Sequence, residues 1–362
     1  MHVVEMRQIT KQFGDVIASD HVDFQLSGGE IHALLGENGA GKTTLMRILF
    51  GIYQEDTGGI LIDGQPVRIG SPKDAIALGI GMVTQHFALV PTFSVAENVI
   101  MGYRDSLSLD MKAIETEVAA SAAKFGIEID PSVIIRHLSV GQKQRVEILK
   151  ALFRDARVLI LDEPTAVLVP QEVDALFGIL HNLRDQGISV VFISHKLNEV
   201  MAISDRVTVL RDGRVISTID TSSTNPIELA KMMVGRETFG VTRQGGVVAD
   251  QPVLRIKNLF AADDRGLKAL TDICLEVNAG EILGIAGVGG NGQKEFAETL
   301  CGIRQPTSGS IQVHDHEMCG STPAEMTAAG VGRIPEDRHA GVVGELSVAE
   351  NMVMEHLARF TS

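Results

Sequence analysis

The sequence has few aromatic residues and few cysteines, and it contains no long apolar segment. Tryptophan is absent, and the three cysteines are odd in number and show no CxxC spacing. They favour neither a disulfide framework nor a zinc site, and they fit a reducing compartment. No run of about 18 apolar residues occurs, so we expect no membrane-spanning helix. The first residues, "MHVVEMRQIT", also lack the pattern of a secretion signal.

Positive charge is scarce as well. The 32 lysines and arginines stand against 46 aspartates and glutamates, which gives a formal net charge of −14. A chain this acidic is not expected to bind nucleic acid or to be held on acidic lipid by charge. The 44% of hydrophobic residues is enough for buried cores, and 362 residues suggest two domains.

One loop pattern occurs twice. The stretch "GENGAGKTTL" at 36–45 spaces its glycines as phosphate-cradling loops do, and "GVGGNGQKEF" at 287–296 repeats the glycines without the lysine and threonine. The match extends from "GGEIHALLG" to "AGEILGIAG", 251 residues later, and "SVAEN" at Ser94 recurs at Ser347. A period of domain size predicts two homologous domains in tandem.

We expect the first domain to span residues 1–235, with a helical subdomain at about 94–151. A stretch rich in glycine and polar residues at 236–252 is the expected linker. The second domain is expected at 253–362 and to be truncated, because the motifs that follow in the first copy have no room to recur.

The apolar pattern predicts an α/β fold. Near-continuous apolar runs in "IHALLG", "RVLILDEP" and "ISVVFISH" are typical of buried parallel strands. The segments "VEMRQIT" and "SDHVDFQL" alternate instead, as strands of an antiparallel edge do. We therefore expect an α/β domain with a mixed sheet core, an antiparallel β edge and a helical subdomain, followed by a partial second copy. With the loop at 36–45, this architecture is similar to that of a P-loop NTPase.

The first loop follows a predicted strand and opens a predicted helix. Its backbone N–H groups and the helix N-terminus would then converge on a phosphate. Lys42 would neutralise phosphate oxygens, and the Thr43 hydroxyl would bind Mg²⁺. The loop residues expected to hold the nucleotide are Gly36, Glu37, Asn38, Gly39, Ala40, Gly41, Lys42, Thr43 and Thr44.

Three polar residues follow the other apolar runs. Asp162 would hold Mg²⁺ directly or through water, and Glu163 would orient or deprotonate an attacking water. His195, in "FISHK", would contact the γ-phosphate and hold Glu163 and the water in place. The alternative reading is that the two acids cap a helix and that the histidine is an ordinary surface residue.

The ordered set of motifs resembles the nucleotide-binding subunits of ATP-binding cassette (ABC) transporters. It consists of the first loop, Gln85, "LSVGQKQRVEILKAL" at 138–152, "LDEPTA" and His195. The resemblance implies two cassettes facing head to tail, with ATP between the loop of one and the "LSxGQ" signature of the other. Pairing would occur within the full-length chain or with a second copy.

The resemblance also implies roles for further residues. Phe13 would stack on adenine, and Gln85 would sense Mg²⁺ and the γ-phosphate. Ser139, Gly141 and Gln142 are the signature residues that would contact ATP. Two positions depart from the pattern: Val140 replaces the more common signature glycine, and Val169 stands where many cassettes carry an aspartate.

The second copy lacks the residues that would hold MgATP. Its counterparts of Lys42, Thr43 and Gln85 are Gln293, Lys294 and Glu336. Phe13 corresponds to Asp264, or to Asp263 if the alignment slips by one residue near the start of the copy. We expect a loop that keeps its shape, with weak hydrolysis or none.

A narrower resemblance links the whole chain to the ATPase subunits of bacterial importers for monosaccharides and nucleosides. It rests on "GVGGNGQ", "PEDRHAG" and "LAKMMVGRE", and "VTQHFALVPTFSVAENVIMG" is most similar to the nucleoside branch. The implied cofactors are ATP and Mg²⁺. The implied partners are integral membrane permease subunits and, through them, a substrate-binding lipoprotein, with the chain peripheral on the cytoplasmic face of the membrane.

A permease helix would lie in a groove near residues 85–97, with Phe87, Leu89 and Pro91 as candidate contacts. Two alternatives stay open at this point. The chain could be a non-catalytic ATP-binding fragment of such a subunit, or a cassette ATPase acting on ribosomes or DNA, which the acidic charge disfavours.

Overall fold

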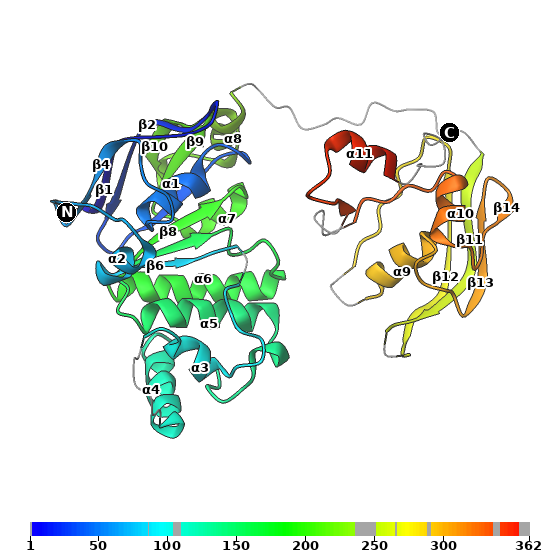
Figure 1. The fold of residues 1–362 in the computed structure, drawn as a ribbon, viewed down its shortest axis with the longest axis horizontal. Coiled ribbons are helices and arrows are strands. Elements are labelled where there is room, and N and C mark those ends of the chain that lie inside the picture. The colour runs from blue at the N-terminus through cyan, green and yellow to red at the C-terminus, as the bar shows by residue number, and fades with distance from the viewer. Residues whose placement is uncertain are drawn as a thin grey trace. The chain divides into compact units, whose positions relative to one another are not determined.

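The structure is a computed structural model that describes residues 2–85, 87–103, 110–235, 251–264, 266–287, 291–335 and 341–354. The chain divides into two compact units, residues 1–240 and 241–362 (Figure 1). Residues 236–250 of the expected linker lie outside the described residues, and so does Glu336. None of the helices in the described ranges combines the length and apolar character that a bilayer span requires.

The first unit begins with an antiparallel sheet of strand order β2-β1-β4-β5. Its strands are β1 (His2–Phe13), β2 (Val16–Ser27), β4 (Thr57–Ile62) and β5 (Gln65–Val67). Alternate side chains such as Met6 and Phe24 are fully or almost fully buried, because one face of this sheet packs on the core around helix α1 (Lys42–Leu49). The alternating segments of the sequence therefore form the expected antiparallel part.

The second sheet of this unit has the order β10-β9-β3-β8-β7-β6. Its strands are β3 (Ile31–Leu35), β6 (Ile80–Val83), β7 (Val158–Asp162), β8 (Ser189–Ser194), β9 (Arg206–Arg211) and β10 (Arg214–Asp220). From β6 to β9 the neighbours are parallel, and β10 runs antiparallel to β9. Every residue of β3, β7 and β8 is buried, which explains their continuous apolar runs.

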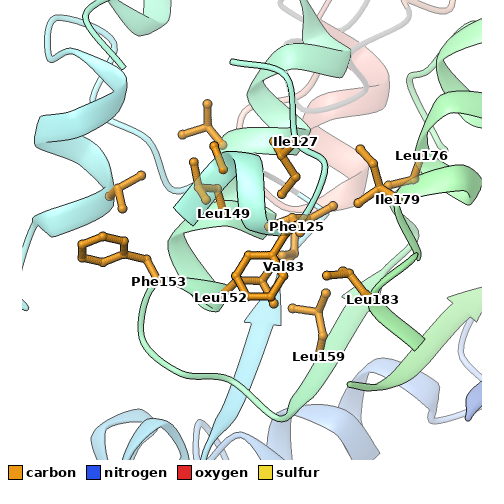
Figure 2. Packing of buried hydrophobic residues seen from close by; sticks show 14 of the residues in the cluster. Val83, Phe125, Ile127, Leu149, Leu152, Phe153, Leu159, Leu176, Ile179 and Leu183 are labelled. Carbon is orange, nitrogen blue, oxygen red and sulfur yellow. The ribbon is translucent and has the colours of Figure 1, made fainter. Parts of the chain in front are cut away.

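Helices cover this sheet and form the helical subdomain. After α1 they are α2 (Pro72–Ala77), α3 (Val95–Ile100), α4 (Met111–Lys124), α5 (Val140–Leu152), α6 (Pro170–Asp185), α7 (Leu197–Ile203) and α8 (Pro226–Val234). Figure 2 shows side chains of α5 and α6 meeting those of the sheet, with Leu149 and Leu183 in the same cluster as Val83 and Leu159. This apolar cluster joins the subdomain to the sheet. The predicted α/β fold with a mixed sheet, an antiparallel edge and a helical subdomain is thus confirmed.

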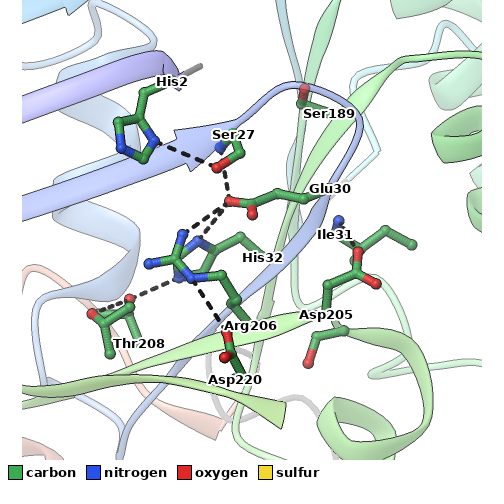
Figure 3. A network of polar contacts seen from close by, with 12 residues as sticks. His2, Ser27, Glu30, Ile31, His32, Ser189, Asp205, Arg206, Thr208 and Asp220 are labelled. Carbon is green, nitrogen blue, oxygen red and sulfur yellow. Dashed lines mark hydrogen bonds and ion pairs between the residues drawn. The ribbon is translucent and has the colours of Figure 1, made fainter. Parts of the chain in front are cut away.

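A buried polar network fixes the start of β3, directly before the phosphate loop (Figure 3). The His32 ring is fully buried, and its two nitrogens lie 3.2 Å from Glu30 Oε1 and 2.7 Å from Thr208 Oγ1. Glu30 Oε1 also accepts hydrogen bonds from the Ser27 amide (2.8 Å) and the Arg206 guanidinium (3.4 Å). Both polar side chains at this end of β3, Glu30 and His32, therefore have partners, and the network joins β3 to β9.

The second unit contains an antiparallel sheet of order β12-β11-β13-β14. Its elements are β11 (Pro252–Ala262), β12 (Lys268–Asn278), α9 (Gln293–Leu300), β13 (Ser308–Val313), β14 (His316–Glu317), α10 (Pro323–Ala328) and α11 (Val348–Val353). The segment that matches β3 forms no strand here, and Ile282 is 98% exposed. In the first unit β3 lies between β8 and β9, and no strand in the described part of the second unit takes their place.

The strand register decides how the copies align. Val4 pairs with Ile62 in the first unit, and Leu254 pairs with Val313 in the second. Leu254 therefore follows Val4 by 250 residues, whereas Val313 follows Ile62 by 251. The alignment of the two copies thus shifts by one residue between the first strand of the second copy and the loop that follows it. Asp263 is the counterpart of Phe13, and the turn that follows is one residue longer in the second copy.

The two copies also share a loop anchor. The Asn98 side chain accepts a hydrogen bond from the Val90 amide at 2.8 Å and donates to the Val90 carbonyl oxygen. Asn351 makes the same pair of bonds with Val343, again with an amide distance of 2.8 Å. Both asparagines lie on a short helix that opens with a serine capping box, so the "SVAEN" repeat of the sequence is a structural repeat as well.

Candidate functional site

The phosphate loop of the first unit joins β3 to α1, and two of its glycines have no room for a side chain. A Cβ at Gly36 would lie 2.4 Å from the Leu210 carbonyl oxygen, and one at Gly41 would lie 2.2 Å from that of Ala18. Gly41 also has a φ of +98°, which L-residues with side chains rarely adopt. Glu37, Asn38, Gly39 and Ala40 complete the loop, and Thr44 is the third residue of α1.

Lys42 folds back over this loop. Its Nζ donates hydrogen bonds to the carbonyl oxygens of Gly36 at 2.8 Å and Glu37 at 2.9 Å, and the side chain is buried. Burial lowers the pKa of Lys42, while the carboxylates of Glu163 and Asp162 act in the opposite direction. An anionic ligand on the loop would replace these two neutral carbonyl partners with charged oxygens, which are stronger acceptors for an ammonium group.

Thr43 and Asp162 come together although 119 residues separate them. The Thr43 hydroxyl donates to Asp162 Oδ1 at 3.1 Å, at the end of β7. Burial raises the pKa of Asp162, and the charge of Glu163 raises it further. A hydroxyl and a buried carboxylate are oxygen ligands of the kind that Mg²⁺ prefers, and a cation would stabilise the ionised form of Asp162. These residues fit a magnesium ion.

Glu163 and His195 form the next contact of the site. Nδ1 of His195 lies 3.0 Å from Glu163 Oε1, and the Glu163 amide donates to the Ile193 carbonyl oxygen at 3.1 Å. Glu163 has a φ of +48°, in the left-handed region that non-glycine residues seldom occupy. Such backbone strain clusters at functional sites, and sequence patterns do not reveal it.

Phe13 ends β1 with 41% of its surface exposed, so it is not a core residue. Its ring lies 5.1 Å from that of Tyr53 in an edge-to-face arrangement, and Lys11 Nζ lies 5.4 Å from its centroid. The Tyr53 hydroxyl accepts a hydrogen bond from Arg47 at 3.1 Å. The sequence analysis missed Tyr53, although it is one of two tyrosines in the chain and stands in the repeated segment "FGIYQ".

Gln85 lies just beyond β6 and is exposed. Among the described residues, no hydrogen bond joins its side chain to the phosphate loop or to Asp162. The chain after it is held to α5 at Ala88, whose amide donates to Glu147 Oε1 at 2.7 Å and whose carbonyl accepts from Lys150 at 3.1 Å. Gln85 thus stands at the edge of the site on a loop that is tied to the helical subdomain.

The signature residues gather at the start of α5. Ser139 caps the helix: its hydroxyl accepts from the Gln142 amide at 3.2 Å, and its own amide donates to the Gln142 side chain at 2.9 Å. Gly141 packs on Glu172, where a Cβ would lie 2.4 Å from Oε1, and the Ser139 hydroxyl donates to the same oxygen at 3.3 Å. Within the described ranges, no hydrogen bond or ion pair joins these residues to the phosphate loop.

The described part of the second loop keeps one close backbone approach of the first loop and lacks its lysine. A Cβ at Gly292 would lie 2.6 Å from the Ala269 carbonyl oxygen, the counterpart of the approach between Gly41 and Ala18. Gln293 donates to the Gly287 carbonyl at 3.3 Å, as Lys42 does to Gly36, but its amide is neutral. Lys294 is exposed, and its Nζ lies 3.7 Å from Glu298. Residues 288–290 lie outside the described residues.

In the second unit, ion pairs occupy the position of the aromatic pair Phe13–Tyr53. Arg304 is the counterpart of Tyr53, and its guanidinium lies 2.6 Å from Asp264 and 2.8 Å from Glu298. Glu298 in turn is the counterpart of Arg47. Because Asp263, the counterpart of Phe13, carries no ring either, the exposed aromatic surface that could stack on a base is missing from this position.

Comparison with known proteins gives one family. The family model "ABC transporter" matches residues 19–166 and 270–362. A glucose import ATP-binding protein of Haloferax volcanii is 46% identical, with 97% of this chain and 70% of the relative covered. The nucleoside import ATP-binding protein NupA of Lactococcus lactis subsp. cremoris is 44% identical, with 98% and 70% covered. The guanosine import ATP-binding protein NupO of Bacillus subtilis is 46% identical over the same shares.

Solved structures agree at the level of the fold. An ATP-binding cassette of an ABC transporter in its ADP conformation covers 65% of this chain and 100% of its own, with a TM-score of 0.59 and 22% identity. A component of an ABC transporter complex from Clostridium perfringens covers 64% of this chain and 92% of its own, with a TM-score of 0.55 and 30% identity. Together with the two matched segments, these findings show that the chain belongs to the ATP-binding proteins of ABC transporters.

Proposed function

We propose that this chain binds and hydrolyses MgATP in its first unit to drive import of a nucleoside or a simple sugar through a membrane permease. The observation that carries the proposal is the convergence of a phosphate loop with Asp162, Glu163 and His195. The names of the relatives support the cargo class, since they include nucleoside, guanosine, glucose and ribose import proteins.

The nucleotide would lie along the loop with its base on Phe13. Base–aromatic stacking contributes about 1–3 kcal/mol per base, and Tyr53 supports the Phe13 ring from its edge. The loop amides and the N-terminus of α1 would hold the β-phosphate. Lys42 would exchange its two carbonyl partners for β- and γ-phosphate oxygens, which are stronger partners because they are charged.

The hydrolytic step would use the residues at the ends of β7 and β8. Thr43, Asp162 and Gln85 would hold Mg²⁺, which when bound neutralises charge on the phosphate oxygens. Glu163 would orient the water and accept its proton while the water oxygen bonds to the γ-phosphorus and the bond to the bridging oxygen of ADP breaks. His195 would hold Glu163 by the 3.0 Å contact and reach the γ-phosphate with its other nitrogen.

Pairing of cassettes would complete the site. The start of α5 presents Ser139, the Gly141 amide and the helix dipole, which together favour an anion. This surface would contact the ATP held by a facing cassette, for example that of a second copy of the chain. The side chain of Gln142 supports the surface by accepting a hydrogen bond from the Ser139 amide at 2.9 Å. The second unit would contribute little hydrolysis, because Gln293 is neutral and Lys294 pairs with Glu298.

The permease would dock beside Gln85, with a substrate-binding lipoprotein on the far side of the membrane and this chain on the cytoplasmic face. Leu89 and Phe87 are both partly buried, but Leu89 packs against the apolar cluster of the helical subdomain, so Phe87 is the better candidate contact. The test is Phe87→Asp in cells that depend on the transporter. Loss of transport and of co-purification with the permease, with ATP binding kept, is expected. Unchanged transport would contradict this docking site.

A further inference from the structure

One carboxylate connects the two loops that carry Glu163 and His195. Glu199, on α7, accepts a hydrogen bond from the Thr165 hydroxyl at 2.5 Å, and Thr165 lies two residues after Glu163. Glu199 also lies 2.9 Å from Lys196 Nζ, and Lys196 directly follows His195. Side chains that follow Glu163 and His195 closely in the sequence therefore bind the same carboxylate.

The contacts form a closed ring. Lys196 Nζ donates to the Thr165 carbonyl oxygen at 3.0 Å, so each of the three residues Thr165, Lys196 and Glu199 binds the other two. Ser194 joins from the strand: its hydroxyl donates to Glu199 at 3.4 Å and accepts from the Lys196 amide at 3.0 Å. His195 is thus flanked on both sides by residues that belong to this ring.

Most of this ring is buried, so its hydrogen bonds can fix the positions of the residues that it joins. Thr165 and Ser194 are each 2% exposed, and 14% of the Glu199 side chain is exposed. Hydrogen bonds to a charged group in such surroundings are stronger than those at the surface. Glu163 has a left-handed backbone, and a strained residue of this kind persists only where its surroundings fix it.

We infer that Glu199 is a positioning residue for ATP hydrolysis, which keeps Glu163 and His195 in contact by binding Thr165 and Lys196 together. It touches neither the reacting atoms nor the nucleotide loop. The inference rests on the proposed function for its catalytic consequence. Its structural part, the dependence of the Glu163–His195 contact on Glu199, can be measured without ATP.

The first experiment therefore records the ring nitrogen chemical shifts of His195 by NMR in the nucleotide-free chain, with labelled histidine. Glu199→Ala is expected to change the Nδ1 chemical shift of His195, because the imidazole leaves the Glu163 carboxylate. Glu199→Gln keeps an oxygen acceptor for Thr165 and is expected to restore most of the wild-type signal. An unchanged Nδ1 chemical shift of His195 in Glu199→Ala would overturn the inference, whatever the activity.

The second experiment measures steady-state ATP hydrolysis and melting temperature. Glu199→Ala is expected to lower kcat about 10- to 100-fold with KM for ATP within about twofold, since small displacements of positioned groups cost this much. The matched control is Glu228→Ala on α8. It removes a carboxylate that accepts a hydrogen bond from the Thr224 hydroxyl at 3.3 Å. A kcat equal to wild type in Glu199→Ala would contradict the catalytic part.

Two further variants keep the test decisive if Glu199→Ala does not fold. Thr165→Val and Lys196→Met break the same ring from its other members and retain Glu199. Each is expected to change the Nδ1 chemical shift of His195 and to lower kcat, and two unaffected variants would overturn the inference. A wild-type chain without ATP turnover, but with a His195 Nδ1 chemical shift that depends on Glu199, would contradict the proposed function and leave the positioning role intact.

Discussion

The Glu163 carboxylate meets the His195 imidazole across the ends of two neighbouring parallel strands, with 3.0 Å between Oε1 and Nδ1. The strand pairing brings them together, because Asp162 on β7 is in register with Ile193 on β8. The residue after each strand end then lies at the same edge of the sheet. Removal of His195 should therefore impair hydrolysis more than binding.

We expect His195→Ala to reduce ATP turnover by about 10²- to 10⁴-fold, the range of a lost acid–base or orienting contact. The reason is that Glu163 loses the partner that holds its carboxylate. ATP affinity should stay within about threefold, because Lys42 and Phe13 are untouched. Measuring kcat by phosphate release and Kd by equilibrium binding separates the two effects, and an equal loss in both would contradict the assigned role.

The two phosphate loops should differ in their response to loss of a lysine. Lys42→Ala is expected to weaken ATP binding by about 1.5–3 kcal/mol, the range for a hydrogen bond to a charged group, or roughly 10- to 100-fold in Kd. Lys294→Ala is the matched control and should leave Kd unchanged, since this side chain is exposed and pairs with Glu298. Titration of the wild-type chain should saturate at one ATP per chain. Two equivalent sites would contradict the loss of function in the second loop.

Helix α6 begins without a side-chain cap, because its N-cap residue is Val169. Glu172 already accepts from the Val169 amide at 3.4 Å, so Val169→Thr would complete a capping box. We expect this change to raise the free energy of unfolding by about 0.5–2 kcal/mol. Urea denaturation measures it, with Val167→Thr as the control, since Val167 is exposed and precedes the helix.

Glu30 should make stability depend on pH in acid. Burial alone raises its pKa, but hydrogen bonds from His32 and the Ser27 amide, with the charges of His32 and Arg206, lower it to about 2. A carboxyl whose pKa is lower in the folded state stabilises fully above its ordinary pKa, near 4.5, and this stabilisation is lost as the pH falls toward 2.

Glu30→Gln should therefore be less stable than wild type at pH 7, by about 3 kcal/mol on the linkage relation. The difference should shrink as the pH falls from 5 to 3, whereas Glu228→Gln should show no such trend. Urea unfolding at a series of pH values measures both. A constant difference across this range would mean that Glu30 acts by packing and not by charge.

The sequence predicted the parts of the site that lie within short motifs. The spacing of the glycine motif predicted the loop glycines, Lys42 and Thr43. Asp162, Glu163 and His195 were predicted because they stand at the carboxyl ends of apolar runs. The apolar runs also predicted the buried parallel strands, because a strand that is covered by helices on both faces is apolar along its whole length.

The contacts between distant segments could not be predicted in this way. Tyr53, Glu172 and Glu199 acquire their partners only through the fold, since 33 residues or more separate Glu172 from Ser139 and Thr165 from Glu199. The left-handed backbone of Glu163 has no sequence signal at all. The one-residue slip between the copies was left open by the alignment and was decided by hydrogen-bond register.

The central claim is that the Glu163 carboxylate in the first unit serves hydrolysis of an ATP held by Lys42. Its most direct test is single-turnover hydrolysis of MgATP by the wild-type chain and by Glu163→Gln, with bound nucleotide identified after rapid filtration. We predict that wild type converts bound ATP to ADP, whereas Glu163→Gln retains ATP unhydrolysed with equal affinity. Hydrolysis at the wild-type rate in Glu163→Gln would contradict the account.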